Sequence, residues 1–263
     1  MLTFAIFLVG VFLLCCGFLY AQQDRFLFFP VRNDTALQRA WREQRVEIAS
    51  GEVVLEGWWA TNATSASAAT VLYFGGNGED VLYTAAVSGP LDARRLLVVN
   101  YRGYGGSTGK PSQKGLFADA LAIYDYAVHQ PGVNADDIVV MGRSLGSGVA
   151  TYLAANRPVR AAILITPYDS ILAIAKEHYP YFPVAMLLRH PFPSDTFAKR
   201  ISVPVLILAA DQDQVVPAVH AQRLFDVWGG AKSIHVLPGV GHNNIDEHPD
   251  YYRMVNEFLD HAS

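Results

Sequence analysis

The pentapeptide Gly142-Arg143-Ser144-Leu145-Gly146 constrains the fold of this chain more than any other stretch. The five residues before it, 137–141, are mostly apolar and β-branched, which is typical of a buried parallel strand. The residues after it, 146–155, are mostly small and favour a helix. A serine at such a strand-to-helix junction sits on a sharp turn that exposes its hydroxyl group. Glycines are expected on both sides because larger side chains would clash there.

Strand-like and helix-like stretches alternate along most of the chain. Residues 45–50 and 53–60 alternate between apolar and polar side chains around Gly51, which predicts an antiparallel hairpin. Short apolar runs separated by helical patterns follow, and strands joined by helical crossovers form a parallel sheet that is covered on both faces. The predicted strands of this part are residues 70–74, 96–100, 137–141, 161–166, 203–209 and 233–237. One predicted helix begins near residue 79, and three others cover residues 115–129, 218–228 and 249–261. We therefore predict an α/β fold with a mostly parallel central sheet and helices on both faces.

The first 21 residues carry no charged side chain and are rich in Leu, Phe, Val and Ile. About 20 apolar residues are enough for a helix to span a bilayer. A cleavable signal sequence is the alternative, but no basic residue precedes the run, and Leu19 is unfavourable three positions before a cut after Ala21. We therefore favour an N-terminal transmembrane helix and a single-pass membrane localisation. The side of the membrane stays open. The positive-inside rule places the domain in the cytoplasm, because the basic residues follow the run, whereas a secretory-type signal anchor places it outside.

The apolar run, its connector and the α/β pattern divide the chain into three parts. These are an anchor or signal sequence (1–21), a juxtamembrane connector (22–44) and an α/β domain (45–263). Within the domain, the segment between Thr166 and Ile201 is rich in aromatic residues and proline and is long for a simple crossover. We interpret residues 168–200 as a short cap over the carboxyl edge of the sheet, which predicts an apolar pocket of acyl size. An ordinary helix with a rigid loop is the alternative.

Composition and spacing exclude several classes of function. A net charge of −4 without a cluster of Lys or Arg argues against a nucleic-acid partner. The two cysteines, Cys15 and Cys16, are adjacent within the apolar run, and the sequence contains no Cys/His spacing typical of zinc. The loop Gly75-Gly76-Asn77-Gly78 lacks the Walker lysine and the spacing of a dinucleotide-binding loop. We expect neither a cofactor nor a metal.

A reactive serine needs a base, and the base needs a carboxylate that orients it. When the serine follows a strand in this way, the acid and the histidine come later in the chain, each on a loop after a strand. His242 is the one histidine of eight in the glycine-bracketed loop directly after the last predicted strand. Asp211 and Asp213 both follow strand 203–209, and we prefer Asp213 because it precedes the turn into the next helix. The predicted catalytic residues are Ser144, Asp213 and His242.

An acyl-transfer site also needs amides that bind the developing oxyanion. The amide of Leu145, directly after the serine, is the first expected donor. The amide of Asn77, in the loop after strand 70–74, is the second. The supporting glycines are Gly75 and Gly76 in that loop, and Gly142 and Gly146 at the serine turn.

These motifs resemble the α/β-hydrolase superfamily, and within it the BEM46-like and ABHD13-like membrane-anchored serine hydrolases. The chain departs from the pattern of that group at two positions: Gly75 stands where histidine is usual, and Asn100 where aspartate is usual. The resemblance implies hydrolysis of esters, thioesters or amides without a cofactor. It rests on the apolar run followed by residues 24–30, and on residues 75–78, 100–107, 142–148, 213–217 and 241–242.

The motifs and the resemblance together favour a serine hydrolase that cleaves an ester or thioester of an acyl or lipid-like substrate. In this hypothesis Ser144 attacks the carbonyl carbon, His242 accepts its proton and Asp213 orients the imidazole. The alternatives are a serine peptidase or amidase that acts on small peptides, and a catalytically inactive hydrolase fold that serves as a membrane-bound scaffold.

Overall fold

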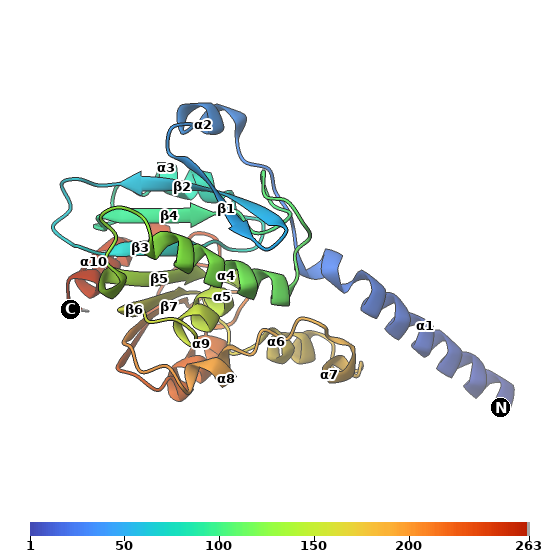
Figure 1. Cartoon of the computed structure of the whole chain (residues 1–263). Coiled ribbons are helices and arrows are strands. Elements are labelled where there is room, and N and C mark those ends of the chain that lie inside the picture. Colours follow the sequence, from blue (N-terminus) through green and yellow to red (C-terminus); the bar gives the residue numbers. More distant parts are fainter. Residues whose placement is uncertain (262–263) are drawn as a thin grey trace.

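An eight-stranded sheet forms the centre of the computed structural model, which describes residues 1–261 (Figure 1). Its strands lie in the order β1-β2-β4-β3-β5-β6-β7-β8. Strand β2 pairs antiparallel with β1 and β4, and the remaining pairs are parallel, so the predicted hairpin and the mostly parallel sheet are confirmed. The strands are β1 (Arg45–Ser50), β2 (Val53–Thr61), β3 (Thr70–Phe74), β4 (Arg95–Val99), β5 (Ile138–Arg143), β6 (Ala161–Ile165), β7 (Val205–Ala210) and β8 (Lys232–Leu237).

The predicted strands all exist, and their ends differ from the prediction by one or two residues. The largest shifts concern β5, which continues to Arg143, and β7, which begins at Val205 rather than Val203. Pro204 has no amide hydrogen, so it cannot continue the ladder as a donor. Strands β3, β6 and β7 are buried along their whole length, which explains their uninterrupted apolar sequences.

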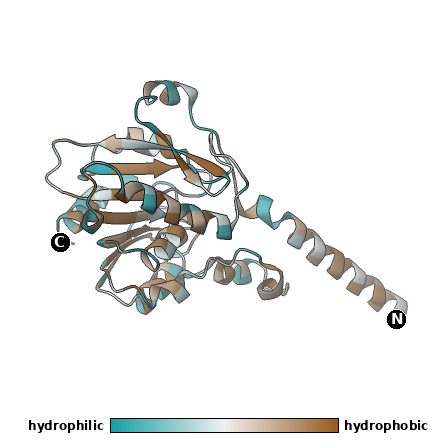
Figure 2. Cartoon of the chain, viewed as in Figure 1, coloured by the Kyte–Doolittle hydropathy of each residue, from teal (hydrophilic) through white to brown (hydrophobic). Residues whose placement is uncertain are grey.

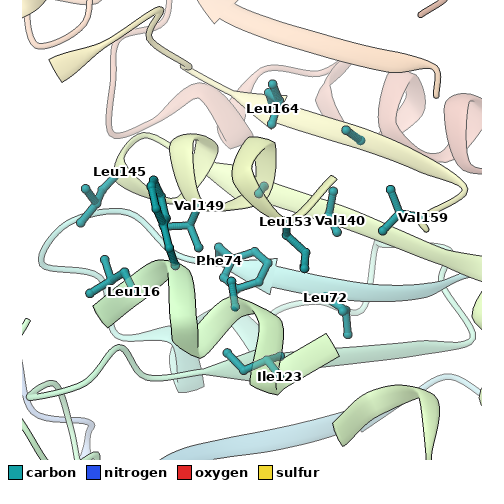
Figure 3. Close-up of a cluster of buried hydrophobic side chains, with 14 of the residues drawn as sticks. Leu72, Phe74, Leu116, Ile123, Val140, Leu145, Val149, Leu153, Val159 and Leu164 are labelled. Carbon is teal, nitrogen blue, oxygen red and sulfur yellow. The ribbon is translucent and has the colours of Figure 1, made fainter. Parts of the chain in front are cut away.

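Helices cover both faces of the sheet and bury two separate hydrophobic clusters. One cluster joins Leu72 and Ile207 of the sheet to helices α4, α5 and α9, and Figure 3 shows part of it around Phe74 and Leu153. The second joins Val71 and other strand residues to helices α3 and α10. Each fully buried Leu, Ile, Val or Phe side chain contributes about 1.5–3 kcal/mol. The helices are α3 (Val81–Ala86), α4 (Gln113–Val128), α5 (Leu145–Ala154), α9 (Ala218–Val227) and α10 (Tyr251–His261).

The segment between β6 and β7 forms three short helices, α6 (Ile171–His178), α7 (Val184–Leu187) and α8 (Ser194–Ala198). Helix α8 packs against α5 and α9. Helices α6 and α7 project from the domain on the side where the N-terminal helix leaves it (Figure 1). Residues of both helices line a cavity that also contains Ser144, and we keep the name cap for this segment.

The N-terminal apolar run forms one long helix, α1 (Leu2–Leu27), which extends away from the domain (Figures 1 and 2). It is long and apolar enough to cross a membrane, with a mean hydropathy of 2.7 in its most apolar window. The helix continues six residues beyond the predicted end at Ala21. The following connector contains the short helix α2 (Thr35–Ala40).

A buried ionic cluster attaches the cap helix α6 to the domain. The His220 imidazole on α9 lies 2.7 Å from Asp169 Oδ1 and 3.2 Å from Glu177 Oε2 on α6. Carboxylates only accept hydrogen bonds, so both ring nitrogens donate and the ring is charged. The hydrogen bond to Asp169 raises the pKa of His220, although burial acts in the opposite direction.

We predict that this cluster stabilises the fold more at pH 6 than at pH 9. Because the pKa of His220 is raised on folding, its contribution is complete below the unfolded value of about 6.5 and is lost as the pH rises through the folded value. The substitution His220→Gln should lower the melting temperature of the full-length protein by about 3–8 °C at pH 6 and by less at pH 9. The exposed His235 gives the matched control, His235→Gln. Equal losses at both pH values for His220→Gln would contradict the charged cluster.

Candidate active site

Ser144 lies at the junction of β5 and α5 in a strained backbone conformation. Its φ of 49° and ψ of −117° fall outside the regions that a serine normally adopts. A Cβ atom at Gly142 would collide with the carbonyl oxygen of Gly146, and one at Gly146 would collide with the carbonyl oxygen of Phe74. The two glycines of the pentapeptide are therefore required by close contacts between the turn, its own helix and strand β3.

Ser144, His242 and Asp213 form one line of hydrogen bonds. The Ser144 Oγ atom lies 2.8 Å from His242 Nε2, and His242 Nδ1 lies 2.7 Å from Asp213 Oδ2. The other carboxylate oxygen of Asp213 accepts from the amides of Val215 and Val216 at 2.8 and 2.7 Å. Since the carboxylate can only accept, Nδ1 carries a proton and Nε2 is free to take one from the serine.

Two other polar side chains have different partners. Asp211 Oδ1 accepts from the amide of Gly239 at 2.9 Å, so this carboxylate binds the turn after β8. His190 is buried, and its Nε2 lies 3.0 Å from Asp24 of helix α1. Within residues 1–261, no group of three or more His, Cys, Asp and Glu side chains has an arrangement that would hold a metal ion.

The loop after β3 lies directly beside the serine. A Cβ atom at Gly76 would be 3.8 Å from the Ser144 Cβ atom. Asn77, Ser144, Leu145 and His242 line the same cavity, so the two predicted amide donors belong to residues of one site.

Glu79 holds this loop in place, a role that the sequence did not reveal. Its carboxylate accepts from the Gly76 amide at 2.6 Å, from the Tyr73 hydroxyl at 2.8 Å and from the Thr84 hydroxyl at 2.6 Å. The Tyr101 hydroxyl donates to the Gly75 carbonyl at 2.7 Å. The signal available in the sequence was the acidic pair Glu79-Asp80 at the predicted start of a helix.

Both departures from the family pattern have a structural reason. A Cβ atom at Gly75 would lie 2.6 Å from Val81 Cγ1, so a histidine fits only if the Val81 side chain or the loop shifts. Asn100 donates from Nδ2 to Asn33 at 2.6 Å and to the buried Glu56 carboxylate at 3.2 Å. An aspartate at position 100 would lack that donor and would repel Glu56.

The Asn77 side chain attaches the end of α1 to the site. Its Oδ1 atom accepts from the Phe29 amide at 2.9 Å and from the Tyr104 hydroxyl at 2.8 Å. Its Nδ2 atom donates to the Leu27 carbonyl at 2.7 Å. The residue predicted for its backbone amide therefore also fixes the position of the juxtamembrane chain.

Arg143, next to the serine, supports the histidine loop. Its Nη2 atom donates to the carbonyl oxygen of His242 at 3.1 Å. Burial disfavours its charge, but the nearby Tyr73, Glu79 and Asp246 outweigh that effect and raise the pKa of Arg143. A charged guanidinium group is thus kept below the loop that carries the histidine.

A cavity of about 460 Å³ opens above Ser144. Its size is in the range of small-molecule sites. Most of its walls are apolar, and they come from three parts of the chain: the end of α1, the cap helices α6 and α7, and the loops after β7 and β8. The apolar lining residues include Leu19, Phe26, Leu27, Ile171, Ile174, Phe182, Val184, Leu187, Leu188 and Val215.

Comparisons with known proteins identify the family and agree with the fold. Residues 69–189 match the family described as the alpha/beta hydrolase fold. The chain is also 36% identical over 233 residues to an uncharacterized protein of Mycobacterium tuberculosis (strain ATCC 25618 / H37Rv), and the match covers 86% of this chain and 83% of that protein. This chain belongs to the α/β-hydrolase family.

Two further relatives confirm the resemblance to the BEM46 and ABHD hydrolases. Protein bem46 of Schizosaccharomyces pombe is 29% identical over 269 residues, which cover 95% of this chain and 90% of that protein. The lysophosphatidylserine lipase ABHD12 of Macaca fascicularis is 32% identical over 234 residues, and the match covers 76% of this chain but 58% of that lipase.

Solved structures show the same fold at lower identity. Est1E from Butyrivibrio proteoclasticus has a TM-score of 0.66 at 19% identity, and the match covers 83% of this chain and 98% of Est1E. The Pyrococcus furiosus esterase Pf2001 has a TM-score of 0.65 at 19% identity, with 88% of this chain and 96% of the esterase covered. The α/β-hydrolase fold predicted from the motifs is therefore confirmed.

We predict that Glu79→Gln loosens the loop beside the serine. A glutamine offers one acceptor oxygen where the carboxylate serves three donors, so at least one buried donor loses its partner, at a cost of about 1–3 kcal/mol of unfolding free energy. Hydrogen exchange of the amides at residues 75–78 should become faster. The exposed Glu52 provides the control Glu52→Gln. Unchanged exchange in Glu79→Gln would show that the loop does not depend on this carboxylate.

Proposed function

We propose that the protein is a serine hydrolase that cleaves an acyl ester or thioester of a lipid-like substrate through an acyl-enzyme. The observation that carries the proposal is the hydrogen-bonded line Ser144–His242–Asp213 at the base of an apolar cavity. No cofactor takes part in the reaction that these residues support.

In the first half-reaction, Ser144 Oγ attacks the carbonyl carbon while His242 Nε2 takes the hydroxyl proton. Asp213 stabilises the imidazolium ion that forms. The negative oxygen of the tetrahedral intermediate is bound by the amides of Leu145 and Asn77. The bond to the leaving alcohol or thiol then breaks, and His242 returns the proton to that group.

In the second half-reaction, water attacks the acyl-enzyme with His242 as base. The bond between the acyl group and Ser144 breaks, the serine regains its proton and the free acid leaves.

Two features support Leu145 and Asn77 as oxyanion donors. Leu145 is the first residue of α5, whose dipole favours negative charge at that end. The neighbouring Gly76 amide is already engaged by Glu79, which leaves Asn77 as the donor of its loop.

The cavity supports an acyl group as the part of the substrate that binds next to the serine. Its lining is mostly aliphatic and aromatic, whereas an extended peptide needs hydrogen-bond partners along its backbone. The relatives point in the same direction, because ABHD12 is named a lysophosphatidylserine lipase. The apolar helix α1 would keep such an enzyme at the membrane, where lipid-like substrates are found. A peptidase is therefore less well supported, and the intact catalytic line argues against an inactive scaffold.

We predict that two substitutions in the catalytic line abolish or strongly reduce ester hydrolysis. Ser144→Ala should lower kcat for a p-nitrophenyl ester by about 10⁵–10⁶-fold. Asp213→Asn should lower it by about 10²–10⁴-fold, because the amide no longer holds His242 in the correct tautomer.

Asp211→Asn is the matched control, because Asp211 lies two residues away and binds the Gly239 amide instead. Its kcat should stay within about threefold of the wild type. The proposed assignment would be wrong if Asp211→Asn lost as much activity as Asp213→Asn, or if Ser144→Ala remained active.

We also predict that the cavity sets the preferred acyl length. Ala175 of α6 lines the cavity, so Ala175→Phe should reduce kcat/KM for long-chain p-nitrophenyl esters by about tenfold or more and leave the acetate ester within about threefold. Ala173→Phe, on the same helix but outside the cavity lining, is the control. A uniform loss for all chain lengths would contradict an acyl site at this position.

A further inference from the structure

One face of helix α1 packs against the cap. The residues of this face are spaced at helical intervals of three and four positions: Phe12, Cys16, Leu19 and Gln23. Cys16 and Gln23 are buried, whereas most side chains of the helix are exposed. The Phe12 ring stacks on the ring of Phe182, with centroids 5.6 Å apart and an interplanar angle of 14°. The contact reaches far along α1 from its junction with the domain.

Polar contacts fix α1 against α7 nearer to the domain. Gln23 donates from Nε2 to the Leu187 carbonyl at 3.0 Å and accepts from the Arg189 amide at 2.7 Å. Asp24 pairs with Arg189 at 2.7 Å and with His190 at 3.0 Å. These contacts fix the position of the cap along the axis of α1.

This position is the middle of the apolar stretch. Residues 2–21 carry no charge and, as a helix, are about 30 Å long, which matches the hydrocarbon core of a bilayer. Phe12 lies halfway along them, about 15 Å from either end. If α1 spans the membrane, its partner Phe182 lies below the surface of the bilayer.

The composition of the cap segment 179–188 suits a position below the surface of the bilayer. Its sequence is Tyr-Pro-Tyr-Phe-Pro-Val-Ala-Met-Leu-Leu. It contains no charged residue; Lys176, Glu177 and His178 precede it, and Arg189 follows it. Tyr181 and Met186 are 88% and 85% exposed, which is unusual for large apolar side chains in contact with water.

The backbone of this segment is also suited to an apolar medium. A buried amide without a partner is costly in lipid. Pro180 and Pro183 have no amide hydrogen, and the amides of Phe182, Met186 and Leu188 donate to carbonyl groups within the segment.

We infer that the segment 179–188 inserts into the bilayer beside α1, so that the cavity receives the acyl chain of its substrate laterally from the lipid. This inference rests on the proposed function for the identity of the ligand. Phe182 contacts the middle of α1 and also lines the cavity, which continues to Ser144. On α1 the cavity wall runs from Leu27 to Leu19, about 12 Å along the helix axis. The anchor helix thus forms one wall of the acyl site, and a lipid with its ester near the interface reaches the serine without crossing water.

The test measures the depth of the cap in vesicles of phosphatidylcholine. The full-length protein, with Cys15→Ala and Cys16→Ala, carries a bimane label at Tyr181→Cys or Met186→Cys. Tyr83→Cys is the matched control, because Tyr83 is 60% exposed but lies on α3. Lipids with a nitroxide on the acyl chain should remove most of the fluorescence at positions 181 and 186 and little at position 83. Aqueous iodide should do the reverse.

Quenching of positions 181 and 186 by iodide, as at position 83, would place the segment in water and overturn the inference. Protection of both positions from both quenchers would place them inside the protein and would overturn it as well. The measurement does not depend on catalysis. Lipid quenching in a protein that hydrolyses no ester would refute the proposed function and leave the insertion standing.

A second readout concerns activity. Tyr181→Asp combined with Met186→Asp should lower hydrolysis of a lipid ester in vesicles by about tenfold or more, because each carboxylate opposes insertion. Hydrolysis of p-nitrophenyl acetate in solution should stay unchanged, since neither side chain lines the cavity. Tyr83→Asp should alter neither rate. Equal rates of the double variant and the wild type on vesicles would contradict lateral entry.

Discussion

The strained backbone at Ser144 is the constraint on which the rest of the structure depends. A non-glycine residue at φ 49° costs about 1–3 kcal/mol and persists only when its surroundings hold it. Here β5 and α5 are both buried, and the glycines on either side let α5 approach β3 closely enough to leave the serine no other position. The same turn directs the Leu145 end of α5 towards the cavity and places Arg143 below the loop of His242. One local distortion thus determines where Ser144, the Leu145 amide and His242 meet.

A second set of contacts connects this site to the N-terminal helix. Asn77 binds the backbone of Leu27 and Phe29 through its side chain, and Gln23 and Asp24 bind the end of the cap. Helix α1, the loop after β3 and the cap therefore support one another. The His220 cluster attaches Asp169, just before α6, and Glu177, near the end of α6, to α9. The cap is therefore held at both sides of the cavity. In this arrangement α1 is a structural part of the proposed acyl site as well as a tether.

Much of the fold, and the approach of Ser144, Asp213 and His242 to one another, could be predicted because the signals are local. Each strand is a short apolar run, and Ser144, Asp213 and His242 each follow a strand of a parallel sheet, whose carboxyl ends share one edge. Tyr101 and Arg143 were missed as supporting residues because their partners are fixed by tertiary packing, and Arg143 meets His242 across 99 positions of sequence. Glu79 was missed although its partners lie within six residues of it, because an acidic residue at the start of a helix is equally typical of the first helical turn. The three cap helices were not separated because helices of four to eight residues are too short for a periodic pattern. The end of α1 was placed too early, since the helix continues through polar residues that bind the cap.

The most direct test of the central claim is the site of covalent labelling by a fluorophosphonate. This reagent reacts with serines that a neighbouring base has activated, so its target reports the nucleophile without knowledge of the substrate. The full-length folded protein is treated, digested and analysed by peptide mass spectrometry. The account predicts one adduct on the peptide that contains Ser144, which disappears in Ser144→Ala. An adduct on another serine, or no adduct on the folded protein, would contradict it.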